Sequence, residues 1–177
     1  MKITDIPIVG VVPAVKPAAQ ITQSKHIGLL ATPATVSSSY TDALIKEHAS
    51  SITTSLYSSV ELVTLAEAFF FTQHLDIEKL HTELDRLNIN NDIDVLVLGC
   101  THFPILAKPI SDYFKARIKL LDSGAAIAKR VSYLLNLSDC QADIKKPLHY
   151  YATADVCSDK LAVKLVTLFD PTLSDKS

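Results

Sequence analysis

The chain has 177 residues, of which 48% are hydrophobic and 20% charged, a composition ordinary for one soluble globular domain with a sizeable core. Its net charge of −2 comes from 17 basic and 19 acidic residues scattered along the chain. This balance provides no basic face for a phosphate backbone, so we expect no nucleic-acid partner. Polar or charged residues interrupt every long apolar run, so we also expect no membrane span and no membrane partner.

The cysteines and histidines give no sign of a disulfide framework or a metal. The 3 cysteines have unrelated spacings and the 6 histidines lack metal-ligand spacing, which favours a reducing compartment and no bound metal. The apolar run at residues 6–15 is interrupted by Pro7 and Pro13, unlike a signal peptide. We therefore expect a cytoplasmic protein.

Strand-length apolar runs alternate with helical patterns along the whole chain. Strands are expected at residues 8–12, 26–31, 52–56, 95–98, 118–121 and 148–152. Helices are expected at residues 14–22, 38–49, 60–71, 77–87, 104–114, 125–135 and 158–168. This rhythm predicts an α/β fold, a mostly parallel sheet with helices on both faces. The polar stretch 136–146 is the best linker candidate.

The first strand end that carries chemistry lies within residues 28–36, where an apolar strand runs into a turn with Thr32 and Thr35. Their hydroxyls and backbone N–H groups are suited to an anion such as a carboxylate. The alternative is that both are helix-capping and turn residues. The serines at 37–39 are expected to cap the next helix, with Asp42 favourable in its first turn.

Two carboxylates lie on the helix expected at residues 60–71, namely Glu61 and Glu67. Their spacing places them on different sides of that helix, so they do not form an acid/base pair. Glu67 has apolar neighbours on both sides in the sequence and is expected to point inward.

The most informative stretch is residues 95–104, an apolar strand that runs through a glycine into Cys100, Thr101 and His102. A helix is expected to follow, with Pro104 in its first turn. Ligands of open α/β sheets bind at the carboxyl ends of strands, which places these three side chains beside a substrate. A helix start would lower the pKa of the thiol and make Cys100 a nucleophile or a general base; the alternative is a buried, inert cysteine. His102 would orient or protonate substrate, or else cap a helix or face solvent.

The last strand end of this kind is at residues 122–124, an Asp-Ser-Gly sequence with the same layout. The alternative there is a tight turn with Gly124 in a left-handed conformation.

Four segments in this order resemble glutamate racemases of the aspartate/glutamate racemase family. GCTHFPIL at 99–106 is similar to the family's second catalytic-cysteine motif, and GLLATPATVSSSY at 28–40 to its substrate-carboxylate turn. VGVVPAVKPAA at 9–19 resembles the hinge and first helix of the second domain, and LLDSGAAIA at 120–128 resembles the return crossover. The similarity runs from about residue 5 to about residue 136.

The resemblance implies a site. Cys100 would be one of two acid/base cysteines flanking the α-carbon, with His102 as its catalytic neighbour. Thr101 and His102 would contact substrate, and Thr32 and Thr35 would bind a carboxylate. Two thiols make physical sense because inversion by proton exchange needs one group to remove the α-proton and another to deliver a proton to the opposite face.

The implied activity is interconversion of L- and D-glutamate without a cofactor, supplying D-glutamate for peptidoglycan. Aspartate remains an alternative substrate. Glu67 matches a glutamate of the family on the preceding helix and is taken as a further substrate-binding residue.

The resemblance also implies a domain organisation. Residues 1–125 would form the second α/β domain of a racemase, and residues 126–177 would cross back to complete a first domain. The family's leading half, with the other catalytic cysteine, has no counterpart here, and neither Cys140 nor Cys157 lies in a matching context. We therefore expect a C-terminal portion that is weakly active or inactive alone.

Two other functions stay open. A non-catalytic module would use the same strand ends to capture a dicarboxylate or to associate with another subunit. A cysteine hydrolase or amidase would use Cys100 as nucleophile and His102 as base, but it needs a third group to orient His102, and the spacing shows none. The oligomeric state is equally open, a homo-oligomer included.

Overall fold

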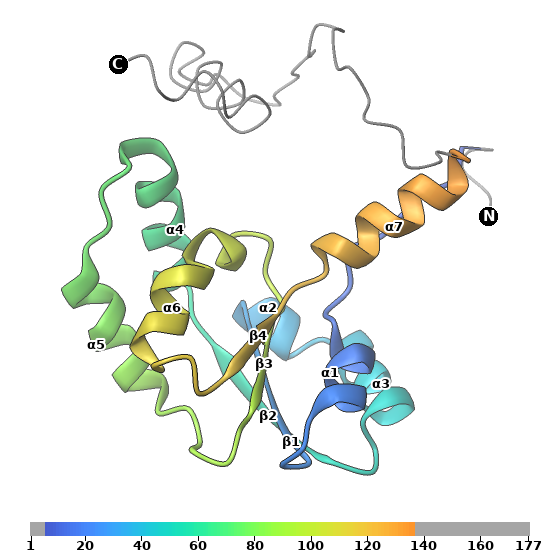
Figure 1. The fold of residues 1–177 in the computed structure, drawn as a ribbon, viewed down its shortest axis with the longest axis horizontal. Coiled ribbons are helices and arrows are strands. Elements are labelled where there is room, and N and C mark those ends of the chain that lie inside the picture. The colour runs from blue at the N-terminus through green and yellow to red at the C-terminus, as the bar shows by residue number, and fades with distance from the viewer. Residues whose placement is uncertain (1–5, 137–177) are drawn as a thin grey trace, which may run out of the picture.

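A parallel sheet forms the centre of the molecule in the computed structural model, which describes residues 6–136 (Figure 1). Its strands are β1 His26–Ala31, β2 Thr53–Ser58, β3 Val95–Leu98 and β4 Lys119–Leu121. The order is β2-β1-β3-β4, and every neighbouring pair is parallel. The predicted α/β fold class is therefore confirmed.

Helices connect consecutive strands and cover the sheet on both faces, as expected. They are α1 Val15–Ile21, α2 Pro33–Val36, α3 Ser39–His48, α4 Glu61–Thr72, α5 Ile77–Leu87, the 3-10 helix η1 Phe103–Leu106, α6 Ala107–Tyr113 and α7 Gly124–Leu134. None of the helices within residues 6–136 combines the length and the apolar character needed to cross a bilayer.

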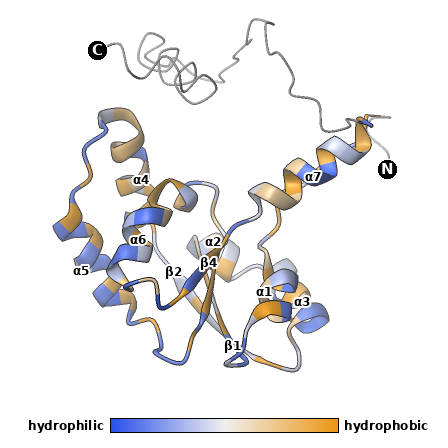
Figure 2. Cartoon of the chain, viewed as in Figure 1, coloured by the Kyte–Doolittle hydropathy of each residue, from blue (hydrophilic) through white to orange (hydrophobic). Residues whose placement is uncertain are grey.

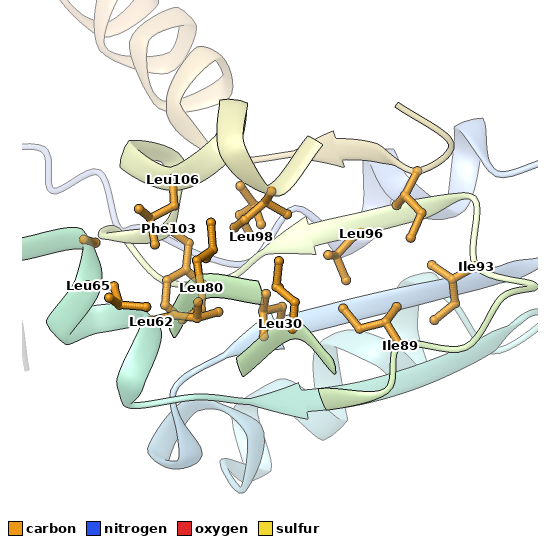
Figure 3. Close-up of a cluster of buried hydrophobic side chains, with 14 residues drawn as sticks. Leu30, Leu62, Leu65, Leu80, Ile89, Ile93, Leu96, Leu98, Phe103 and Leu106 are labelled. Carbon is orange, nitrogen blue, oxygen red and sulfur yellow. The ribbon is translucent and has the colours of Figure 1, made fainter. Parts of the chain in front are cut away.

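The two central strands alternate between two hydrophobic clusters. Leu30 and Leu96 point into the larger cluster, which α4, α5, η1 and α6 cover (Figure 3). Their neighbours Leu29 and Val97 point into a smaller cluster under α1 and α3. Successive side chains of a strand face opposite sides of a sheet, so a strand covered on both faces is apolar throughout. This is why β1 and β3 read as continuous apolar runs.

Local sequence signals set the helix boundaries. Asp76 caps α5 by accepting a hydrogen bond from Lys79 N at 3.0 Å, and Asn88 ends it in a left-handed conformation with φ 45°. Ser38 caps α3 by accepting from Tyr40 N at 3.2 Å, and Asp42 lies in the first turn of that helix. The capping role expected within residues 37–39 is therefore confirmed.

Two of the expected elements are wrong in detail. Residues 8–12 form no strand: they pair with none of the four strands, and Ile8 is 80% exposed. The helix expected at 104–114 is divided into η1 and α6. Pro109 lacks the N–H that an uninterrupted helix would use there, but as the third residue of α6 it needs no intrahelical partner.

The expected strand at 148–152, the helix at 158–168 and the linker beyond residue 136 lie outside the described residues. Within the described part, α7 extends away from the sheet (Figure 1). Hydrophobic residues recur along it (Figure 2), and Tyr133 and Leu135 near its end are 71% and 63% exposed.

Candidate active site

The turns that follow β1, β3 and β4 meet at one edge of the sheet, because the carboxyl ends of parallel strands lie together. They border a cavity of about 640 Å³. Its polar lining includes Thr35 from the first turn, Cys100 and Thr101 from the second, and Asp122 and Ser123 from the third. Side chains far apart in sequence thus share one concave surface of the size that small ligands occupy.

Cys100 is held at the end of β3 by backbone contacts on both sides. Gly99 N donates to Leu30 O at 2.8 Å, and Phe103 N donates to Cys100 O at 3.1 Å. Phe103 is fully buried and anchors the turn in the larger core. Cys100 itself is half-buried and lines the cavity, unlike the buried, inert cysteine of the alternative interpretation.

The glycine before the thiol is required by close packing. A Cβ at Gly99 would lie 2.8 Å from Leu29 Cδ1 and 3.1 Å from Ala31 Cβ, both inside ordinary contact distance. The expectation that Cys100 itself starts a helix is wrong, since η1 begins at Phe103 and has only 4 residues. The turn, rather than a helix end, positions the sulfur.

His102 connects the thiol to a carboxylate. Its Nδ1 lies 3.7 Å from Cys100 Sγ, and its Nε2 lies 3.2 Å from Glu67 Oε1. With the ring proton on Nε2, His102 donates to Glu67 and leaves Nδ1 as an acceptor for the thiol proton. The arrangement can therefore take a proton from Cys100 and return it.

Glu67 does not point inward as its neighbours suggested. Its side chain is 59% exposed, because α4 buries the face formed by Leu62, Leu65 and Ala66 and turns Glu67 away from that face. The contact with His102 supplies the orienting group that sequence spacing did not show. Glu67 and His102 border a separate hollow of about 280 Å³, and Thr101 lines both this hollow and the larger cavity.

The two threonines of the β1 turn interact with each other. Thr32 precedes α2 as its N-cap residue, but its side chain makes no capping hydrogen bond. Its Oγ1 instead lies 3.1 Å from Thr35 Oγ1. Thr35 lines the cavity and Thr32 does not, so Thr35 is the one placed to meet a ligand.

The β4 turn closes the far side of the cavity. Gly124 N donates to Asp122 Oδ1 at 2.7 Å, and Ser123 Oγ donates to Val12 O at 2.5 Å. Gly124 begins α7, and none of the glycines within residues 6–136 has a positive φ, so the left-handed turn considered from sequence is wrong.

One buried polar residue of this region was missed. Thr41, on α3, is 1% exposed, lines the cavity and donates to Thr35 O at 2.6 Å. The sequence carried no signal for it, because the contact depends on how α3 folds back against α2. No cluster of three His, Cys, Asp or Glu side chains able to hold a metal ion occurs in the described part of the chain.

These features agree with the family to which the sequence can be assigned. Residues 1–131 match the family described as Asp/Glu/Hydantoin racemase, and the chain belongs to this family. The resemblance expected from the four collinear segments is thereby confirmed.

Individual relatives are glutamate racemases. That of Shewanella halifaxensis is 49% identical over 173 residues, which cover 97% of this chain and 65% of the relative. That of Shewanella frigidimarina is 49% identical over 151 residues, covering 85% of this chain and 57% of the relative. The chain thus spans less than two thirds of the length of these curated relatives.

Solved structures give the same result. Escherichia coli glutamate racemase, in complex with L-glutamate and the activator UDP-MurNAc-Ala, superposes with a TM-score of 0.79 at 35% identity. The match covers 96% of this chain and 63% of that one. The glutamate racemase isoform RacE1 of Bacillus anthracis, at 23% identity and a TM-score of 0.71, shares the fold.

Proposed function

We propose that this chain acts in a glutamate racemase, a cytoplasmic isomerase that interconverts L- and D-glutamate without a cofactor and supplies D-glutamate for peptidoglycan. Family membership and the glutamate racemases among its relatives support this function. The observation that carries it is the position of Cys100, half-buried on a cavity at the sheet edge with His102 Nδ1 at 3.7 Å.

Cys100 serves as the acid/base group on one face of the α-carbon. As a thiolate it takes the α-proton on Sγ and leaves a carbanion. In the reverse direction, as a thiol, it gives its own Sγ proton to the carbanion that forms when the opposite-face group has removed the α-proton. His102, oriented by Glu67, accepts the thiol proton on Nδ1 and so sets the protonation state of the sulfur. A second acid/base group must approach from the opposite face, because one base cannot invert a stereocentre efficiently.

The substrate carboxylates meet hydroxyl donors. Thr35 and Thr101 line the cavity together with Cys100, and both side chains present O–H groups. Thr32 supports Thr35 through their hydroxyl contact. Glu67 acts through His102 in this scheme, rather than binding the substrate directly.

The domain organisation implied by the resemblance is part of the proposal. Residues 1–125 would be one α/β domain, and residues 126–177 would complete another domain that carries the opposite-face group; residues 137–177 lie outside the described part of the chain. The boundary falls in the first turn of α7, a helix without a buried residue. Exposed apolar side chains on residues 6–12 and on α7, such as Ile8 at 80% and Tyr133 at 71%, offer surface for that domain.

A cysteine hydrolase is the second candidate, and the contact between Glu67 and His102 is the observation that favours it. A nucleophile, a base and an orienting carboxylate in line are what such an enzyme uses. Family membership favours the racemase. The two candidates differ in product, since a racemase exchanges the α-hydrogen and a hydrolase cleaves an amide or ester bond.

Deuterium wash-in at the α-carbon tests the proposal directly. L-glutamate in heavy water is incubated with the chain alone, and with the chain plus the part of the Shewanella halifaxensis relative that it does not cover. Proton NMR follows the α-hydrogen, and chiral chromatography follows D-glutamate. We expect little exchange by the chain alone and clear exchange by the combination.

Cysteine variants make this test specific. Cys100→Ser should abolish exchange in the combined sample, whereas Cys140→Ser and Cys157→Ser, thiols that match no family motif, should leave it unchanged. A combined sample that exchanges no α-hydrogen while the intact relative does, or that exchanges it equally well with Cys100→Ser, contradicts the proposal. Release of ammonia from glutamine by the wild type but not by Cys100→Ser would favour the hydrolase.

A further inference from the structure

The helix that presents Thr35 has only one small apolar contact with the core, through Val36, which is half-buried and packs against the smaller cluster. α2 spans only Pro33–Val36 and contains no buried residue. It follows directly from Thr32, at the end of β1, and leads into α3. A segment with so little buried apolar surface depends on hydrogen bonds from its neighbours for a fixed position.

The neighbour that supplies a buried hydrogen bond is Thr41, in the first turn of α3. Its Oγ1 donates to Thr35 O at 2.6 Å, shorter than the 3.3 Å contact of Ser38 N with the same oxygen. Thr41 is 1% exposed, so water cannot replace its hydroxyl easily. Its bond acts on the backbone of the residue whose hydroxyl faces the cavity.

We propose that Thr41 is a positioning residue, whose hydroxyl holds the α2 turn so that Thr35 faces the ligand cavity in one orientation. The identity of the ligand, a glutamate carboxylate, rests on the proposed function. Thr41 lines the same cavity, but its hydroxyl proton is already donated to Thr35 O. Thr41 therefore acts through Thr35 and is not itself a hydrogen-bond donor to the substrate.

Replacing the hydroxyl by a methyl group isolates this role. Thr41→Val keeps the branched shape that fills the buried site and leaves Thr35 O without its short hydrogen bond. Thr41→Ser keeps the hydroxyl and removes the methyl group. Thr82→Val is a control for the loss of a hydroxyl at an exposed position, since Thr82 Oγ1 also donates to a backbone carbonyl, Glu78 O at 2.8 Å, on a helix away from the cavity.

Amide hydrogen exchange in the full chain reads out the turn itself. The amides of Thr35, Val36 and Ser37 all donate to carbonyls at the start of α2 at 3.0 Å and report its opening. In Thr41→Val we expect their exchange to rise about tenfold, the effect of losing one hydrogen bond, while the exchange of Gly99 N, in the turn after β3, stays unchanged. Thr41→Ser and Thr82→Val should leave all of these amides close to the wild type.

Glutamate binding and Cys100 alkylation show whether the loss of this hydrogen bond affects the ligand cavity without unfolding it. By NMR titration, the dissociation constant for L-glutamate should rise about tenfold in Thr41→Val and recover in Thr41→Ser. The rate at which iodoacetamide alkylates Cys100 should stay within about twofold, which general unfolding of the site would not allow. If Thr41→Val fails to fold, Thr41→Ala is used in the same way.

The outcomes separate the two proposals. Unchanged exchange at Thr35, Val36 and Ser37 in Thr41→Val overturns the positioning role, and so does Thr41→Ser behaving like Thr41→Val. Faster exchange of these amides in Thr41→Val supports the positioning role even where the wild-type chain binds no glutamate, and that lack of binding counts against the proposed function. Weaker binding with unchanged exchange overturns the inference, because the effect would then not pass through the turn.

Discussion

The two edges of the sheet treat their polar groups in opposite ways. At the amino edge, Asp94 accepts hydrogen bonds from Thr22 Oγ1 at 2.6 Å, Gln23 N at 2.6 Å and Ser24 N at 3.0 Å. There Arg117 donates to Asn91 O at 2.6 Å. These bonds fasten the loops that lead into the strands to one another.

The carboxyl edge leaves comparable groups facing a cavity. Thr35 and Thr101 line it without any bond between their side chains and the loops opposite, and Cys100 is held to the edge by its backbone. The amino edge therefore uses these polar atoms for stability, whereas the carboxyl edge, besides its own bonds of Thr41 to Thr35 and Ser123 to Val12, leaves Thr35 and Thr101 on the cavity wall, as the proposed function requires. Substitutions at the two edges should separate stability from chemistry.

Removal of the thiol should have the largest effect, and only on chemistry. In the assembled racemase, Cys100→Ser should lower α-hydrogen exchange by about 10²- to 10⁴-fold, the range of a lost general acid/base group. Its thermal midpoint should stay within a few degrees of the wild type, because the side chain is half-buried and the backbone holds the turn. A large fall in the thermal midpoint would show that the Cys100 side chain also contributes to stability at the carboxyl edge of the sheet.

Filling the space at Gly99 should affect both stability and chemistry. Gly99→Ala pushes a methyl group against Leu29 and Ala31 and should cost about 1–3 kcal/mol of unfolding free energy, typical of overpacking. Alkylation of Cys100 should change as the turn shifts. Gly10→Ala is the control, since nothing lies within 4 Å of an added Cβ there. Equal denaturation midpoints for the two variants would contradict this account of the turn.

At the amino edge, Asp94→Asn should reduce stability and leave chemistry intact. The amide cannot carry the charge that three donors satisfy, so we expect a loss of about 1–2 kcal/mol, allowing for partial exposure of the carboxylate. Urea denaturation measures the loss, and alkylation of Cys100 should proceed at the wild-type rate. Slower alkylation would mean that the edges are coupled.

The same carboxylate predicts a pH dependence. Burial raises the pKa of Asp94, but the hydrogen bonds from Thr22, Ser24 and Gln23 outweigh it and lower the pKa from 3.8 to about 2. Since the folded-state pKa is depressed, the contribution to stability is complete above about pH 4 and is lost as the pH falls towards about 2. Urea midpoints measured between pH 5 and pH 2 (~0.5 unit steps) should fall less steeply in Asp94→Asn than in the wild type. Equal pH dependence of the urea midpoints in the wild type and in Asp94→Asn would rule out this contribution of Asp94 to stability.

The smallest expected effect is an increase in stability from a substitution at Thr54. Thr54 Oγ1, on β2, is buried and has no hydrogen-bond partner among residues 6–136. Thr54→Val keeps the shape and removes the unsatisfied hydroxyl, so it should raise the unfolding free energy by up to about 1 kcal/mol. Thr53→Val, at an exposed position of the same strand, provides the comparison. A loss of stability in Thr54→Val alone would indicate a partner for this hydroxyl, such as a bound water.

The sequence allowed the strands and most helices to be predicted where local signals agree. β1 and β3 have the predicted bounds because a strand covered on both faces must be apolar throughout, and α5 carries its own cap and apolar stripe. Residues 8–12 are also largely apolar but pair with none of the four described strands. An apolar run alone cannot distinguish these two situations.

The candidate site could be predicted only in part for a similar reason. Strand ends of a parallel sheet converge, so the gathering of Cys100, Thr101 and Thr35 around one cavity was predictable. The approach of Glu67 to His102 was not, because it depends on how α4 packs against η1. The bond from Thr41 to Thr35 likewise depends on the tertiary fold.

The bond from Ser123 Oγ to Val12 O has a mechanical consequence. It joins the segment before α1 to the turn before α7, across 111 residues of sequence. A pull on either segment would therefore be passed to the other, and so to the walls that Val12 and Ser123 contribute to the cavity. Tension on the segment before α1 would reach the β4 turn through one serine hydroxyl.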